Sequence, residues 1–90
     1  MSAKEMFEKL GYELIRDCEF YLFYEKALKE NAEYENDYLH ISFEKQDKEV
    51  IKTYGDDNSP EAITMRELQA INKQVEELGW NKWRENVKLV

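Results

Sequence analysis

Two helix-ending signals constrain what this chain can fold into more than any other feature. Near the start the sequence runs Glu8-Lys9-Leu10-Gly11-Tyr12, and near the end Glu76-Glu77-Leu78-Gly79-Trp80. In both, a charged helical turn leads to leucine, glycine and a large aromatic residue, the pattern that ends a helix with a left-handed glycine and a hydrophobic contact. We therefore expect one helix at each end of the chain, with other structure between them.

Both predicted helices also have a start signal. Ser2 precedes Glu5 by three residues, and Thr64 precedes Glu67 by three, which is the spacing of a capping box. Apolar residues then recur at helical spacing, with charged and amide residues such as Glu67 and Gln74 largely on the other faces. The apolar positions are Ala3, Met6, Phe7 and Leu10 in the first helix and Leu68, Ile71, Val75 and Leu78 in the second. Two amphipathic helices therefore need a core to cover.

The middle of the chain has the pattern of β-strands. Residues Tyr38–Glu44 alternate strictly between apolar and polar, which is typical of a half-buried strand, and the β-branched run Glu49–Tyr54 follows a short polar break. Upstream, Tyr12–Arg16 and Glu19–Tyr24 can pair across a turn at Asp17-Cys18. We expect a two-layer α+β domain at 1–80: a helix, a mainly antiparallel meander of three or four strands and a helix, with both helices on one face.

Three segments lack a clear pattern. Residues 27–37 suit either a long hairpin loop or a helical turn, and the turn-forming cluster at 55–60 separates the last strand from the second helix. The tail at 81–90 suits a short helix, a docked segment or disorder.

Length and composition limit the class of protein. Ninety residues make one domain, and no stretch approaches the roughly 18 to 20 apolar residues that span a bilayer. The first residues run directly into a capped helix and do not resemble a signal peptide. Cys18 is the single cysteine, so an internal disulfide is impossible. We expect a cytoplasmic protein without membrane contact.

No residue pattern indicates catalysis, a metal or a cofactor. His40 is the single histidine and falls on the polar side of its strand, where a surface histidine is the ordinary interpretation. Cys18 lies between two carboxylates, which raise the pKa of a thiol and weaken it as a nucleophile. The run 56–59 offers oxygen ligands but lacks the spacing of a calcium loop, and the three glycines lie too far apart for a phosphate loop. We expect no enzyme.

An aromatic sheet face is the more serious functional candidate. If the apolar side of Tyr38–Glu44 packs under the helices, Tyr38 and His40 face away from them. The neighbouring strand then adds either Tyr21 and Phe23 or its alternate residues, Phe20, Leu22 and Tyr24. A second candidate contact surface comprises Trp80 and Trp83.

The charge distribution bears on the partner of such a face. The net charge is -7, and residues 1–61 hold 16 acidic against 8 basic residues. Direct nucleic-acid binding is disfavoured, because phosphate recognition needs cationic grooves. Two interpretations remain open: a solvated acidic surface, or an acidic decoy that occupies a basic nucleic-acid-binding groove on another protein.

The second helix and its ending, Ile63 to Trp80, together with Phe7-Glu8-Lys9-Leu10-Gly11-Tyr12, resemble small uncharacterised proteins encoded by phages and prophages of Gram-positive bacteria. The resemblance covers roughly residues 3–80 and implies a bacterial host cytosol. It favours an accessory protein that binds or regulates a host or phage protein. The alternative is a homo-oligomeric structural or assembly factor.

Overall fold

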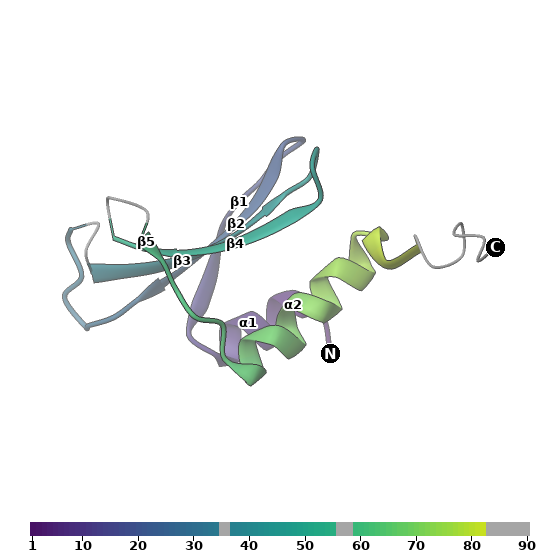
Figure 1. The fold of residues 1–90 in the computed structure, drawn as a ribbon. Helices are drawn as coiled ribbons and strands as arrows, with labels where there is room; N and C mark the ends of the chain where they lie inside the picture. Colours follow the sequence, from purple (N-terminus) through teal and green to yellow (C-terminus); the bar gives the residue numbers. More distant parts are fainter. Residues whose placement is uncertain (35–36, 56–58, 83–90) are drawn as a thin grey trace.

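A computed structural model describes residues 1–34, 37–55 and 59–82 (Figure 1). The α+β class is confirmed. Along the described part of the chain, one helix precedes an antiparallel meander of five strands and a second helix follows it. In space, both helices lie on one side of the sheet. The elements in chain order are α1 (Ala3–Lys9), β1 (Tyr12–Asp17), β2 (Tyr21–Ala27), β3 (Tyr38–Glu44), β4 (Glu49–Tyr54), β5 (Ser59–Pro60), α2 (Met65–Glu77) and a short 3-10 helix, η2 (Trp80–Lys82).

The helix ends match the sequence signals. The Ser2 hydroxyl accepts from the Glu5 N–H at 3.1 Å, and Thr64 forms a complete capping box with Glu67. Gly11 and Gly79 have φ values of 94° and 77°, the left-handed conformation that glycine adopts without steric cost. These two glycines therefore end α1 and α2 as predicted.

The bounds of two strands agree with their sequence patterns. β3 and β4 have the predicted bounds, whereas β2 begins two residues later than predicted and extends to Ala27. β2 begins later because the Cys18 N–H donates to the Tyr21 carbonyl at 2.9 Å, which closes a turn at 18–20. The meander also has a fifth strand, β5, where the sequence indicated only a turn. Pro60 has no N–H, which suits a strand at the margin of a sheet.

The core lies between the sheet and the two helices. The Phe7 ring of α1 stacks on Tyr24 at 4.1 Å between ring centroids and meets Phe43 edge-on at 6.0 Å. The remaining buried apolar residues of this cluster are Tyr12, Leu22, Ile41, Ala70 and Ile71. The Ala3 N–H donates to the Glu77 carboxylate at 2.8 Å, so the start of α1 lies beside the end of α2.

The buried face of α2 differs from the predicted one. Leu68, expected in the core, is 38% exposed, whereas Glu67 and Gln74, expected on the outer faces, are buried. The reason is that both polar side chains have partners inside: Glu67 pairs with Lys52, and Gln74 accepts from the Tyr24 hydroxyl at 2.6 Å. These hydrogen bonds and the ion pair offset the desolvation penalty of the buried polar groups, so the face of α2 that packs on the sheet includes them.

In the described part of the connection between β2 and β3, the Asp37 carboxylate binds the backbone that precedes it. Asp37 accepts from the N–H groups of Glu33 and Tyr34, and these bonds lower the pKa of Asp37. The Leu28 N–H donates to the Asp37 carbonyl at 2.7 Å, which joins the two ends of the connection.

Candidate functional site

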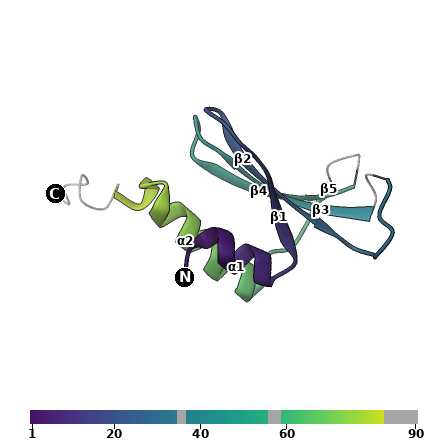
Figure 2. The ribbon, with the colours of Figure 1, turned by 180° about the vertical axis from the view of Figure 1, so that it is seen from behind.

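The sheet has one face covered by helices and one face that no described element covers (Figure 2). Leu22 and Tyr24 of β2 are buried under the helices, so the alternate residues Tyr21 and Phe23 point the other way. This alternation resolves which residues of the second strand lie beside Tyr38 and His40. We call the side away from the helices the open face, defined by Glu13, Arg16, Tyr21, Phe23, Glu25, Tyr38, His40, Ser42, Glu44, Glu49, Ile51 and Thr53.

Four aromatic side chains form a continuous row across the open face. The Tyr21 and Phe23 rings are perpendicular with centroids 6.5 Å apart, and the Phe23 and His40 rings stack at 4.9 Å. Tyr38 continues the row, 6.3 Å from His40. The sequence pattern left two alternatives for the second strand, and in the fold Tyr21 and Phe23 lie beside Tyr38 and His40 on one face.

His40 is buried within this row. Its exposed fraction is 7%, although it lies on the uncovered side of the sheet, because Phe23 and Tyr38 flank its ring. Its Nε2 lies 3.1 Å from the Glu25 carboxylate. The prediction of an ordinary surface histidine was therefore wrong, since neighbouring aromatic rings on the same face shield the imidazole.

Carboxylates border the aromatic row in opposed pairs. Glu13 lies directly opposite Glu25 on the neighbouring strand, and Glu44 lies directly opposite Glu49. Directly opposed like charges destabilise a sheet. Among the strand-paired positions of the open face, Arg16 is the only lysine or arginine. The aromatic row therefore lies between two pairs of opposed carboxylates, one of which, Glu25, also contacts His40.

A hollow of about 260 Å³ lies at one end of the row, lined by Tyr21, Phe23, Ser42 and Glu44. A second hollow of about 290 Å³ shares three of these residues and extends toward Ile51. The Ser42 hydroxyl donates to the Glu44 carboxylate at 2.9 Å, which orients one carboxylate oxygen. Aromatic rings beside a carboxylate attract cations, so this end of the face is suited to a basic side chain.

A buried polar cluster on the helix side was not foreseen from the sequence. The Lys52 ammonium donates to the Glu67 carboxylate at 2.9 Å and to the Ala62 carbonyl at 2.7 Å, and the Tyr12 hydroxyl donates to the other oxygen of Glu67. Burial favours a raised pKa for Glu67, but the Thr64 N–H, Tyr12 and Lys52 together lower it. Burial and contact with Glu67 raise the pKa of Tyr12. These contacts attach the start of α2 to the sheet. Of this cluster, the sequence pattern indicated only the capping box of Thr64 and Glu67.

The remaining sequence candidates lie apart from the open face. Trp80 is partly buried and contacts Phe43 on the helix side, with ring centroids 6.2 Å apart, while Trp83 lies outside the described residues. Residues 56–58, part of the run considered as a calcium loop, also lie outside the described residues. The pKa of Cys18 is lowered, first by a backbone hydrogen bond from Phe20, with a contribution from Arg16. The expected raised thiol pKa was therefore wrong.

No protein-family model, curated protein or solved structure matches this chain. Within the described ranges, no group of three or more histidine, cysteine, aspartate or glutamate side chains is arranged to hold a metal ion. Nor does any helix in those ranges combine the length and apolar character required to cross a bilayer.

Proposed function

We propose that this chain is a non-enzymatic protein that binds a basic surface of another protein through the open face. The observation that carries the proposal is the opposition of Glu13 to Glu25 and of Glu44 to Glu49. Like charges held opposite each other on neighbouring strands cost stability, and a nearby cation removes that cost. A basic partner supplies the cation and gains an ion pair with each carboxylate.

The hollow beside Glu44 supports recognition of a lysine or arginine side chain. The perpendicular Tyr21 and Phe23 rings form two walls, and the carboxylate completes the site. Arg16 already makes such a contact within the chain, with its guanidinium carbon 5.7 Å from the centroid of the Tyr21 ring. A partner's cation would use the same attraction between a charge and an aromatic face, strengthened by the carboxylate.

The charge of the open face also narrows the class of partner. Its carboxylates repel phosphate, which disfavours direct binding of nucleic acid, and they repel a second copy of the same face. A basic protein surface is the complementary choice. One specific form is an acidic decoy that occupies a nucleic-acid-binding groove. The resemblance to phage and prophage proteins makes proteins of the phage or its host the first partners to test.

A peptide titration followed by amide chemical shifts tests the binding face. The probe is a synthetic peptide in which lysine and arginine alternate with serine, and the control peptide carries glutamate in place of each basic residue. The amides of Phe23, Ser42 and Glu44 should shift with the basic peptide, whereas those of Ala70 and Ile71 in the core should not. Shifts confined to the helices, or equal shifts with the acidic peptide, would contradict the proposal.

Paired variants extend the test to natural partners. Glu44→Lys and Phe23→Ser alter the open face. Glu76→Lys and Leu68→Ser are the matched controls, glutamate to lysine and apolar to serine, on exposed positions of α2. A protein captured from host lysate supports the proposal only if the first two variants lose it and the last two retain it. For the decoy, duplex DNA should compete with this chain for the captured protein.

A further inference from the structure

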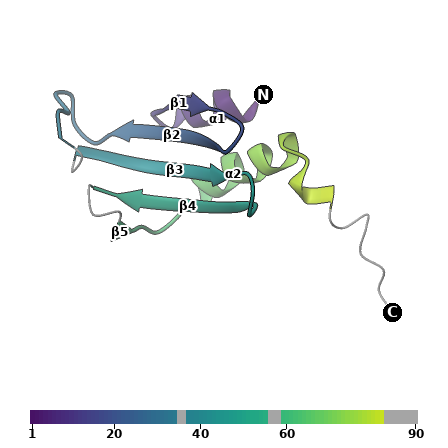
Figure 3. The ribbon, with the colours of Figure 1, turned by 90° about the horizontal axis from the view of Figure 1, so that it is seen from above.

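β1 forms one margin of the sheet. The strand order runs from β1 to β5, so the outer side of β1 has no strand partner in the described part of the chain (Figure 3). The opposite margin, β5, is two residues long and contains Pro60, which cannot extend a hydrogen-bonded ladder. β1 spans six residues without a proline. Of the two margins, β1 is the one that can accept another strand.

A β-bulge gives this margin an unusual charge pattern. The register shifts between Leu14 and Arg16, which makes Ile15 the extra residue. Glu13 pairs with Glu25 and Arg16 pairs with Phe23, and these two β2 residues lie on the same face. Residues three apart in a regular strand point to opposite faces. Here the bulge brings an acid and a base onto the open face of one short strand.

We propose that a second copy of this chain pairs antiparallel along β1, with Glu13 of each copy opposite Arg16 of the other. Such pairing centred between Leu14 and Ile15 is two-fold symmetric, so each contact occurs twice. The sequence Glu13-Leu14-Ile15-Arg16 is self-complementary in this register, with acid opposite base and apolar opposite apolar. Bulges and charged side chains protect an edge from unselective pairing, so the partner strand has to match this charge pattern.

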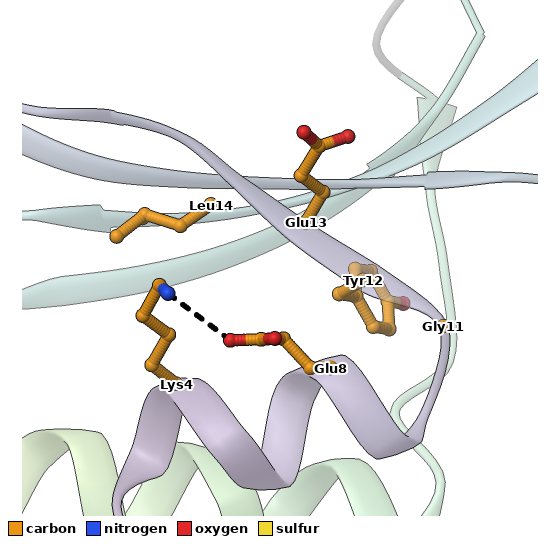
Figure 4. Close-up of a pocket in the computed structure, with 6 residues that line it drawn as sticks. All are labelled: Lys4, Glu8, Gly11, Tyr12, Glu13 and Leu14. Carbon is orange, nitrogen blue, oxygen red and sulfur yellow. Dashed lines mark ion pairs between the residues drawn. The ribbon is translucent and has the colours of Figure 1, made fainter.

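The surroundings of β1 support the same occupant. Glu13 lies opposite Glu25 within its own chain, and Arg16 of the second copy brings a cation beside Glu13. On the helix side, an open groove of about 460 Å³ runs between α1 and β1, lined by Lys4, Glu8, Gly11, Tyr12, Glu13 and Leu14, with the Glu13 carboxylate pointing away from α1 (Figure 4). The two-fold axis is perpendicular to the sheet, so both copies keep their helices on the same side. The groove leaves space there for the second copy.

This inference does not rest on the proposed function. It shares the opposition of Glu13 to Glu25 with that proposal, but the hollow at Tyr21 and Glu44 and the opposed pair Glu44 and Glu49 lie further along the open face. Pairing through β1 would join two open faces into one continuous surface. Glu44→Lys should therefore leave the dimer intact, so the two proposals can fail separately.

Sedimentation velocity across a concentration series tests the dimer with charge-reversal variants. The wild-type chain should dimerise, whereas Glu13→Arg and Arg16→Glu should each weaken dimerisation about tenfold or more, because each reversal acts twice across the axis. Mixing these two variants should restore association as a heterodimer, since both contacts then join arginine to glutamate. The double variant E13R/R16E should dimerise by itself, and Glu76→Arg should match the wild type.

Circular dichroism establishes that each variant is folded before it is sedimented. Should one single variant fail to fold, the double variant still tests the register, because it restores every opposed pair. A wild-type chain that stays monomeric at the highest soluble concentration would overturn the proposal. So would folded single variants that dimerise as strongly as the wild type, or a mixture that does not associate.

Discussion

The Lys52 ammonium on β4 lies 2.9 Å from the Glu67 carboxylate in the first turn of α2, and 6% of each side chain is exposed. Lys52 also donates to the Ala62 carbonyl, and Glu67 also accepts from Tyr12. One buried ion pair thus joins the sheet, the segment before α2 and the helix cap. Because α2 covers the side of the sheet opposite the open face, this pair helps to determine which face stays uncovered.

Neutralising one partner of this pair should destabilise the fold strongly. Glu67→Gln leaves the Lys52 ammonium buried without a counter-charge, and we expect a loss of about 3 kcal/mol in the free energy of unfolding. Urea denaturation measures the change. The control is Lys4→Gln in the exposed Lys4–Glu8 pair, where the loss should stay below about 0.5 kcal/mol. Equal losses in the two variants would contradict the structural role of Lys52 and Glu67.

The same cluster predicts how stability depends on pH. The folded-state pKa of Glu67 is lowered from 4.5, so its contribution is complete above that value and is lost as the pH falls through the folded pKa. The folded-state pKa of Tyr12 is raised from 10.0, and that of Tyr24 is raised to about 12, first by burial. Stability that depends on the neutral phenols is complete below pH 10.0 and is lost as the pH rises through the folded values.

Thermal unfolding followed across pH separates the two effects. Glu67→Gln should flatten the decline on the acid side, and Tyr12→Phe should reduce the decline on the alkaline side. If the loss of stability at low pH is unchanged in Glu67→Gln, other carboxylates and not Glu67 are responsible for that loss.

The hydrogen bond from Tyr24 to Gln74 predicts a non-additive pair of substitutions. Tyr24→Phe leaves the Gln74 carbonyl without its 2.6 Å donor, and Gln74→Leu leaves the Tyr24 hydroxyl without an acceptor. Each should cost about 1 to 3 kcal/mol, because a buried polar group is left unsatisfied. The double variant should cost less than the sum, since both polar groups are then gone. A double-mutant cycle by urea denaturation measures this coupling. If the two losses of stability simply add, the hydrogen bond between Tyr24 and Gln74 does not contribute to stability as we predict.

Gly79 provides a test of the helix-ending signal. At a φ of 77°, Gly79→Ala should cost about 1 kcal/mol, because the added Cβ disfavours the left-handed conformation. Gly79→Asn should cost less, since asparagine tolerates that conformation better. Melting temperatures of the two variants give the comparison. Equal stability of Gly79→Ala and the wild type would show that the glycine conformation contributes little.

Local signals account for the parts of the fold that the sequence predicted well. Ser2, Thr64, Gly11 and Gly79 act through their own backbone and immediate neighbours, so their roles can be inferred from spacing alone. The strict alternation of β3 likewise needs only one strand. These signals led to the helix, meander, helix order.

The parts that were missed depend on contacts distant in sequence. Glu67 is buried because Lys52 and Tyr12 meet it in space, and neither partner can be identified from the pattern of α2. For the candidate site, the alternation placed Tyr38 and His40 together, but the burial of His40 required the register with Phe23. The opposed glutamates and the bulge at Ile15 also follow from register alone.

The affinity of the basic peptide for Glu44→Lys, compared with Glu76→Lys at low and moderate salt, tests the central claim most directly. Both variants change the net charge equally, but of these two glutamates Glu44 lines the hollow and Glu76 does not. We predict that Glu44→Lys weakens binding about tenfold or more and reduces its salt dependence, while Glu76→Lys stays close to the wild type. Equal affinities for the two variants would show that net charge, and not the open face, binds the peptide.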